Sequence, residues 1–550
     1  MTRPLWTLAE IVAASGGTID PPSADVKGSE PAIRGISIDT RSLAPGDLFV
    51  PLADARDGHD FVTAAFDRGA AAALVRESYA RRPGDGLLVR VDEPLRALER
   101  IGIAARARLS DAARVIAVTG SAGKTGTKEM LRACLKVCAS SPEKVHAPEK
   151  SFNNHWGVPL TLARMPADTE FGVFEIGMNH AGEIRPLTKM VRPHLAIVTN
   201  VLPVHVGNFE DGEIGVANAK AEIFEGLEAP AAGSTRSADA SGVAAHANVA
   251  RTPQHVSPPP SGEGSGVGGP NDLRGRDFTP PLTPPLQGEG NVSEHSAARG
   301  AVAIILRDTP HFELLREAVA RRGARVLSFG LHGEADFRLS ADPGEQADGT
   351  QYVVAELRSS GRKIGFDLGM LGQHLAINSL AVVAALEALG CDAKRATSAL
   401  GSVRSAAGRG ARHVLGAPGE QILLLDESYN ANPASMRAAL EGLAGTDFGG
   451  RRIAVLGDML ELGAESARYH VGLKDAAEHA DLVLCCGPAM RHLYDALAAQ
   501  KKAAWAPSSV DLIPHVLDTL RPGDAVMVKG SLGSRMAPIV EAIKKRFPGN

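Results

Sequence analysis

The chain has few cysteines, no long apolar run and almost no net charge. Its cysteines are Cys134, Cys138, Cys391, Cys485 and Cys486, and none belongs to a C-x-x-C pair, which argues for reduced thiols and against a disulfide framework or a zinc site. Lysine and arginine total 59 against 63 aspartates and glutamates, so no basic field favours nucleic acid or anionic lipid. No apolar run approaches the roughly 18 residues of a membrane-spanning helix. We expect a cytoplasmic monomer that acts on small molecules, without nucleic-acid partners or membrane insertion.

One glycine-rich loop is the most informative stretch. The apolar run Val115–Thr119 leads into Gly120-Ser121-Ala122-Gly123-Lys124-Thr125-Gly126 and then into helix-forming residues. In such a loop the backbone N–H groups face phosphate oxygens, the lysine reaches the outer phosphates and the threonine offers a hydroxyl to Mg²⁺. The longer motif would have its first glycine at Val118, so this is the short form. The alternative is a chance Gly-Lys-Thr in a surface turn, but the flanking strand and helix favour a nucleoside triphosphate site.

Length and patterning predict an α/β protein of three domains. Residues 1–112 read as a small α/β unit, and 113–410 alternate apolar strands with helices, as a mostly parallel sheet does. Residues 411–550 repeat that pattern and predict a Rossmann-like unit. The segment at about 229–298 is rich in Pro, Gly, Ser and Ala, a composition that predicts disorder. We interpret it as a tolerated surface insertion; a proline-rich docking segment is the alternative.

Polar residues follow two apolar strands of the middle region. The strand at 171–176 carries Glu175 near its end, and the strand at 195–200 leads to His205. Ligands gather at the carboxyl ends of parallel strands, so these side chains should converge on the glycine loop. Mg²⁺ prefers oxygen ligands, which makes His205 an unusual one. The alternative is that Glu175 forms a surface ion pair and that His205 is an ordinary loop residue.

A third string identifies a family. Residues 217–226, Ala-Asn-Ala-Lys-Ala-Glu-Ile-Phe-Glu-Gly, together with the loop, Glu175 and His205, resemble the Mur ligase superfamily of ATP-dependent amide-forming enzymes. By composition alone Lys220 is a solvated helix lysine. The resemblance implies instead that Lys220 carries a carbamate, an anion whose formation needs a neutral amine. It also implies two Mg²⁺ sites, one at Thr125 and Glu175 and one at Glu175, His205 and Lys220.

Further strings are similar to the branch of this family that joins D-Ala-D-Ala to a UDP-muramoyl tripeptide. They lie at residues 39–41, 46–49, 57–61, 152–161, 372–378, 408–409, 426–436, 457–463 and 529–531. The resemblance implies a catalytic set of Lys124, Glu175, His205 and Lys220. Besides the loop residues, it implies nucleotide contacts from His374, Asn378, Arg409 and Asp426. It implies substrate contacts from Thr40, Arg41, Asn153, Asn154, Asn179, Asn430, Asn432 and Asp458.

The implied reaction uses ATP and passes through an acyl phosphate. The chain departs from the family at Leu306, where an asparagine usually contacts adenine. It also lacks the Asp-Asn-Pro-Arg string of the diaminopimelate-adding relatives. Two other functions stay open: a folate polyglutamate-forming ligase and a non-enzymatic nucleotide-binding regulator. The third residue of the stem peptide, diaminopimelate or lysine, is not determined by the sequence.

Overall fold

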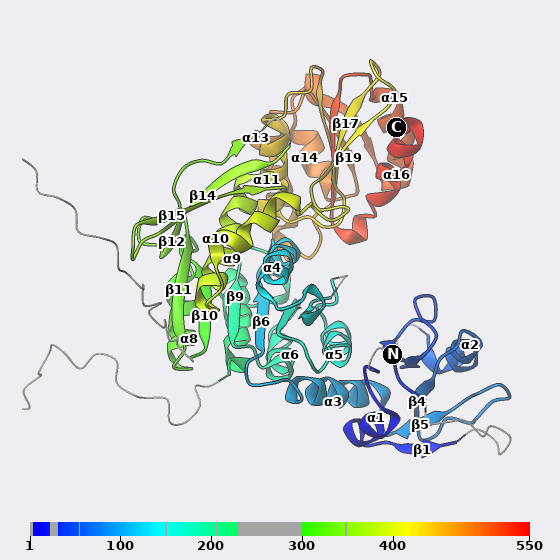
Figure 1. The fold of residues 1–550 in the computed structure, drawn as a ribbon. Helices are drawn as coiled ribbons and strands as arrows, with labels where there is room; N and C mark the ends of the chain where they lie inside the picture. The colour runs from blue at the N-terminus through cyan, green and yellow to red at the C-terminus, as the bar shows by residue number, and fades with distance from the viewer. Residues whose placement is uncertain are drawn as a thin grey trace, which may run out of the picture. The chain divides into compact units, whose positions relative to one another are not determined.

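The structure is a computed structural model that describes residues 4–21, 31–53, 56–148, 151–204, 206–228, 300–346 and 349–549. The insertion predicted at about 229–298 and the predicted metal ligand His205 lie outside the described residues. The described residues form three sheets, which follow one another along the chain from blue to red in Figure 1. Most of their strands are parallel, which confirms the predicted fold class.

The N-terminal sheet has five strands in the order β1-β5-β4-β3-β2. Only the β1–β5 pair is antiparallel among its described pairs. Its strands are β1 Thr18–Asp20, β2 Gly35–Ser37, β3 Asp47–Phe49, β4 Ala72–Arg76 and β5 Leu88–Val91. Its helices are α1 Leu8–Ser15, α2 Val62–Asp67 and α3 Pro94–Ala107. Thr7 and Glu10 form a capping box at the start of α1, which fixes the entry of the chain into this region.

The central sheet has ten strands, and its parallel part has the order β7-β8-β6-β9-β10-β11-β12. An antiparallel extension follows through β14, which pairs with β12, β13 and β15. The strands are β6 Arg114–Thr119, β7 Val145–His146, β8 Phe171–Glu175, β9 Leu195–Val198, β10 Val302–Leu306, β11 Arg325–Gly330, β12 Phe337–Leu339, β13 Gly344–Glu345, β14 Gln351–Leu357 and β15 Arg362–Leu368. Because β6 lies between β8 and β9, the carboxyl ends of these three strands are neighbours.

Helices cover both faces of the central sheet, as Figure 1 shows around β6 and β9. One face packs against α4 Lys124–Cys138, α9 Gln373–Ala388 and α10 Ala393–Ala396. The other packs against α5 Gly157–Ala163, α6 Ile184–Val191, α7 Gly212–Ala221 and α8 Phe312–Ala320. β6 is buried on both faces, which explains its continuous apolar sequence.

The C-terminal sheet has six strands in the order β16-β17-β21-β18-β19-β20. Only the β16–β17 pair is antiparallel among its described pairs. The strands are β16 Ala411–Leu415, β17 Ile422–Glu427, β18 Arg452–Gly457, β19 Leu482–Cys486, β20 Lys502–Ala506 and β21 Ala525–Lys529. The helices are α11 Pro433–Ala444, α12 Ser466–Val471, α13 Lys474–Ala477, α14 Met490–Ala496, α15 Ser509–Thr519 and α16 Ala537–Arg546. Apolar clusters on both faces of this sheet make it a doubly wound unit.

None of the helices in the part of the chain that the structure describes is long and apolar enough to cross a membrane. All five cysteines carry free thiols.

Glu228 and Val302 lie on the two sides of the undescribed segment 229–299. Both are hydrogen-bonded to the short turn directly before β9. The Glu228 N–H donates to the Pro193 carbonyl at 2.9 Å, and the Val302 N–H donates to the His194 carbonyl at 3.0 Å. The Glu228 side chain also pairs with His194 at 2.6 Å and with Arg192 at 3.1 Å. Because two consecutive carbonyls hold the two sides, the positions of Glu228 and Val302 do not depend on what connects them.

We therefore predict that replacing residues 229–299 by a short Gly/Ser linker preserves the fold. Shortening a surface connection changes the closure entropy only slowly, by about 0.6 kcal/mol for each halving of loop length. The melting temperature should stay the same or rise by a few degrees, and ligand binding should be unchanged. Differential scanning calorimetry and nucleotide titration measure both. An insoluble deletion variant, or one that melts well below the full chain, would contradict this interpretation.

Candidate nucleotide site

The glycine loop between β6 and α4 has glycine at the two positions where its backbone demands it. Gly120 has φ 149° and Gly123 has φ 80°, a region that residues with side chains rarely adopt. A Cβ at Gly120 would collide with Thr199 Oγ1, and a Cβ at Gly123 would collide with the Asn378 amide. Helix α4 then begins at Lys124, so its unpaired N–H groups and the positive end of its dipole face the loop.

Residues just past β9 hold the loop from one side. Thr199 Oγ1 donates to the Ala122 carbonyl at 2.6 Å, and the Ala122 N–H donates to Asn200 Oδ1 at 2.9 Å. The Ser121 N–H donates to the Asn200 carbonyl at 3.1 Å. Sequence reasoning placed Thr199 and Asn200 at a strand end without assigning them a role. Their contacts exist because β6 and β9 are neighbours in the sheet.

Thr125 and Glu175 meet where β6 and β8 end. Thr125 Oγ1 donates to Glu175 Oε2 at 2.9 Å, and Asn153 Nδ2 donates to Glu175 Oε1 at 2.8 Å. Ser151 Oγ lies 3.3 Å from Thr125 Oγ1 and accepts from Arg409 Nη2 at 3.3 Å. Glu175 is 1% exposed. A buried carboxylate beside a hydroxyl is an oxygen-donor set that suits Mg²⁺, so the predicted metal ligands Thr125 and Glu175 fit that ion.

Two lysines, the half-buried Lys124 and the buried Lys220, belong to the same site. Lys124 Nζ donates to the Gly120 carbonyl at 2.6 Å. Burial lowers the pKa of Lys124, the Glu175 carboxylate opposes this shift and Arg409 adds to it. Lys220 on α7 is 3% exposed, and burial, followed by repulsion from Lys124, lowers its pKa well below the usual lysine value. A lowered pKa enlarges the neutral, nucleophilic fraction of the amine.

The second predicted metal site stays a prediction, because His205 lies outside the described residues. The described ranges contain no group of three or more His, Cys, Asp or Glu side chains that could hold a metal ion. Mg²⁺ commonly takes one or two protein carboxylates and completes its shell with water and substrate phosphates. The Thr125–Glu175 pair agrees with that pattern.

The start of α9 lies against the loop. The Asn378 amide contacts Gly123, and Leu375 is 3.5 Å from the position of a Cβ on Gly126. His374, in the first turn of the same helix, is exposed. Leu306, which replaces the family asparagine, packs against the hydrophobic core on the α9 face of the sheet.

Arg409 and Asp426, the remaining predicted nucleotide residues, have partners of their own. The Arg409 guanidinium lies 4.0 Å from the centre of the Tyr429 ring, besides its bond to Ser151. The Asp426 carboxylate accepts from the Gly408 N–H at 3.0 Å and from Ser428 Oγ at 2.6 Å. Asp426 therefore orders the turn that carries Arg409, and its role toward a ribose stays a prediction.

The predicted substrate residues fall into three groups. Asn154, Asn432 and Asp458 each accept a hydrogen bond from a backbone N–H near the start of a helix, α5, α11 and α14 respectively. Asn153 is bonded to Glu175. The rest, which are exposed or half-buried, are Thr40, Arg41, Asn179 and Asn430. Their contacts with a substrate stay predictions.

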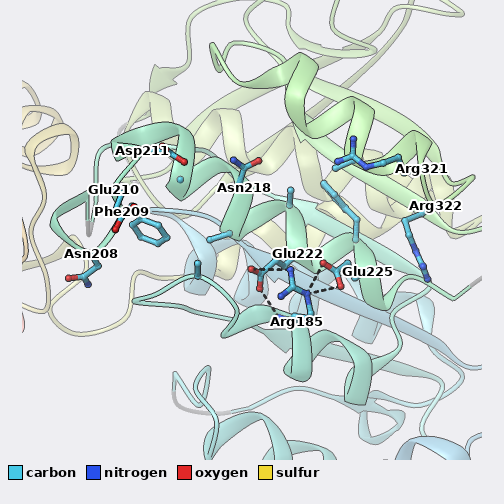
Figure 2. Close-up of a pocket in the computed structure, with 16 residues that line it drawn as sticks. Arg185, Asn208, Phe209, Glu210, Asp211, Asn218, Glu222, Glu225, Arg321 and Arg322 are labelled. Atoms are coloured by element: carbon cyan, nitrogen blue, oxygen red, sulfur yellow. Dashed lines mark hydrogen bonds and ion pairs between the residues drawn. The ribbon is translucent and has the colours of Figure 1, made fainter.

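A separate cavity of about 590 Å³ lies beside α7 and is shown in Figure 2. It is lined by residues of α6, α7, α8, the loop before α7 and the 3-10 helix η4 Glu222–Gly226. Arg185 pairs there with Glu222 at 3.6 Å and with Glu225 at 2.9 Å. Its lining includes none of the glycine loop and neither Glu175 nor Lys220. The cavity is therefore not part of the predicted nucleotide site.

A glycine loop that follows a central parallel strand, with Lys124 and Thr125 beside a buried carboxylate, defines a P-loop nucleotide-binding protein. Comparison with known families narrows this class. Residues 118–255 and 291–386 match the Mur ligase middle domain, and residues 413–532 match the Mur ligase, glutamate ligase domain. The chain belongs to the Mur ligase family.

Similarity to individual relatives extends over nearly the whole chain. The UDP-N-acetylmuramoyl-tripeptide--D-alanyl-D-alanine ligase of Bacillus subtilis is 28% identical and covers 98% of this chain and 98% of its own length. The ligase of the same name from Escherichia coli is 28% identical, with 95% and 96% covered. A crystal structure of MurF from Acinetobacter baumannii has a TM-score of 0.72 at 24% identity, with 98% of this chain and 100% of that chain covered. The described fold is therefore the fold of that protein.

Gly123→Ala should weaken nucleotide binding by about tenfold or more, because a Cβ there meets both an unfavourable φ and the Asn378 amide. Isothermal titration with ADP measures the change. Gly323→Ala is the matched control, since Gly323 also has a positive φ but no atom lies within 4 Å of its Cβ position. Equal ADP affinity in Gly123→Ala and the unaltered protein would show that the loop is not packed as described.

Proposed function

We propose that this protein is an ATP-dependent ligase that joins D-Ala-D-Ala to a UDP-N-acetylmuramoyl tripeptide, giving ADP, phosphate and the UDP-muramoyl pentapeptide for peptidoglycan synthesis. The observation that carries the proposal is the Thr125–Glu175 pair at the positive end of α4, beside Lys124. It occurs in a chain similar over nearly its whole length to relatives named for this activity. Since ATP is the energy source, the reaction belongs in the cytoplasm.

The three regions divide the substrates among them in this proposal. Residues 1–112 hold the UDP-sugar, with Thr40 and Arg41 as contacts. Residues 113–410 hold ATP, with Asn153, Asn154 and Asn179 near the reacting end of the tripeptide. Residues 411–550 bring the dipeptide, with Asn430, Asn432 and Asp458 as contacts. A closing motion is implied, because the reacting groups come from different regions.

Two chemical steps account for the products. The terminal carboxylate of the tripeptide attacks the γ-phosphorus of ATP, and the bond to ADP breaks to leave an acyl phosphate. The amine of D-Ala-D-Ala then attacks the acyl carbon, and phosphate leaves as the amide forms. Phosphoryl transfer needs positioning and charge neutralisation more than covalent help from the protein. The unpaired N–H groups at the start of α4 and the Lys124 ammonium supply both, once Lys124 exchanges the Gly120 carbonyl for a phosphate oxygen.

Mg²⁺ would neutralise the phosphates and polarise the γ-phosphoryl group when bound. Thr125 and Glu175 would hold it, and their separation of 2.9 Å and burial suit a shared oxygen ligand set. Asn153 and Ser151 keep these two side chains in place. The Arg409 guanidinium stacks on Tyr429 and donates to Ser151, which contacts Thr125. From this position it can reach a phosphate bound beside Thr125 and Glu175.

Lys220 would carry a carbamate, formed when its amine adds to CO2 and loses a proton. The addition needs a neutral amine, and the surroundings of Lys220 favour that form, since the side chain is buried and repelled by Lys124. The modified side chain would be an anion near the Lys124 cation, which reverses the unfavourable electrostatics of the unmodified lysine. Together with Glu175 and His205, this anion would supply the second Mg²⁺ site.

The function is tested by phosphate release measured with UDP-muramoyl tripeptide, ATP and Mg²⁺, with and without D-Ala-D-Ala. Release should require both the tripeptide and the dipeptide. Lys124→Ala should lower the rate by about a thousandfold, as the loss of a charge-neutralising group in phosphoryl transfer does. Lys136→Ala, on the last turn of α4, is the matched control and should leave the rate unchanged. Turnover with a folate acceptor in place of the tripeptide would favour the folate polyglutamate-forming function instead.

The carbamate makes activity depend on CO2. Buffer stripped of CO2 should lower the rate several-fold, and added bicarbonate should restore it. Lys220→Ala should lose about a hundredfold or more of the rate, because one metal ligand is missing. Acetate or propionate, which can occupy the space with a carboxylate, should recover part of that activity, whereas bicarbonate should not. Full activity of Lys220→Ala would rule out the carbamate.

A further inference from the structure

Lys128 lies wholly inside the protein, one turn along α4 from Lys124, and the proposed mechanism does not use it. Its side chain is 0% exposed. Its ammonium donates to the Pro148 carbonyl at 2.7 Å and lies 2.6 Å from Glu129 Oε1. A buried ammonium is unfavourable unless it is paired and hydrogen-bonded, and an apolar side chain at such a position is commonly as stable or more stable. The presence of a lysine here therefore calls for a role beyond packing.

Pro148, whose carbonyl accepts from Lys128, lies three residues before Ser151, where the described segment 151–153 reaches the nucleotide site. Residues 149 and 150 lie outside the described residues. Ser151 Oγ lies 3.3 Å from Thr125 Oγ1, and Asn153 Nδ2 donates to Glu175 at 2.8 Å. The Asn153 carbonyl also accepts from the Gly177 N–H at 2.8 Å, just past the end of β8. Pro148 is thus hydrogen-bonded to α4, and the segment 151–153 is hydrogen-bonded to the carboxyl end of β8 at Asn153.

Glu129 determines what kind of effect Lys128 can have. Its carboxylate is adjacent to the ammonium and is itself 27% exposed, so it cancels most of the positive charge as seen from the site. A neutralised pair exerts little field at a distance. The remaining interaction is the hydrogen bond from Lys128 to the Pro148 carbonyl. Lys128 can therefore act on the site by fixing the position of Pro148.

We propose that Lys128 is a positioning residue for the nucleotide site: its hydrogen bond to Pro148 places the segment that holds Ser151 and Asn153 against Thr125 and Glu175. The same helix therefore supplies the phosphate-binding lysine, the metal-binding threonine and the anchor for the residues that orient both metal ligands. The kinetic part of this inference rests on the proposed function.

The test compares Lys128→Met with the unaltered protein in three measurements: the rate of peptide ligation, the Mg²⁺ concentration at half-maximal rate, and ADP affinity with and without Mg²⁺. We expect the maximal rate to fall by about tenfold or more and the Mg²⁺ requirement to rise by about threefold or more, because second partners of metal ligands act at this scale. ADP affinity without Mg²⁺ should change less than about twofold, since the loop at 120–126 keeps its own contacts.

Two control variants separate positioning from a loss of structure. Lys144→Met removes a lysine that directly precedes β7 and pairs with Glu170 at 3.0 Å. This variant should leave all three measurements unchanged. The double variant K128M/E129Q removes both charges together, so no carboxylate is left without its partner. It should reproduce the kinetic defect of Lys128→Met, and it replaces that variant if Lys128→Met does not fold.

The proposal is wrong if the variant that folds has an unaltered rate and Mg²⁺ requirement. It is equally wrong if ADP affinity without Mg²⁺ falls together with the rate, since Lys128 would then only support the fold. If the unaltered protein forms no peptide bond, the proposed function fails while Lys128 is still tested. In that case Mg²⁺ should strengthen ADP binding in the unaltered protein and should do so at least about threefold less in the folded Lys128 variant.

Discussion

The absence of a side chain at Gly120 and Gly123 is the constraint on which the site depends. It lets the turn after β9 and the start of α9 lie directly on the backbone of the loop, at Thr199 and Asn378. These segments are far apart in sequence, and together with α4 they enclose the loop. The loop N–H groups therefore have a fixed direction before any ligand arrives, which lowers the entropy lost on binding.

The site carries more positive than negative charge. Lys124 and Arg409 lie around one buried carboxylate, Glu175, and Lys220 lies near Lys124. Burial, with repulsion from a neighbouring cation, lowers the pKa values of the two lysines. Such an arrangement is destabilising in a protein without ligand and favourable once a polyanion enters. A ligand that binds only the folded state also raises the stability of that state. The electrostatics thus link the stability of the central region to occupation of its site.

The strands β6, β8 and β9 could be predicted because their apolar runs are buried on both faces. The meeting of Thr125 with Glu175 followed from one rule, that strand ends gather at one edge of a parallel sheet. The contacts of Thr199, Ser151 and Lys128 could not be predicted, because they depend on the order β7-β8-β6-β9, which one sequence does not determine.

The predicted substrate residues show a second limit of sequence reasoning. Asn and Asp bind ligands and cap helices with the same side-chain oxygens. Asn154 and Asn432 have the residue type expected at a binding site, and both accept backbone hydrogen bonds near helix starts. A motif therefore locates such a residue without distinguishing between the two uses. Contacts with a bound substrate make that distinction.

The attachment of Glu228 and Val302 to neighbouring carbonyls has a consequence for how the central sheet is assembled. β9 and β10 pair in parallel through backbone hydrogen bonds. The Glu228–Arg192 ion pair and His194 lie beside the start of β9. The covalent link between the two sides contributes mainly by keeping them at high local concentration. The residues up to 228 and those from 300 onward thus act as two complementary parts of one sheet. The connection between them is a natural position at which to open the chain in a circularly permuted or split form of the enzyme.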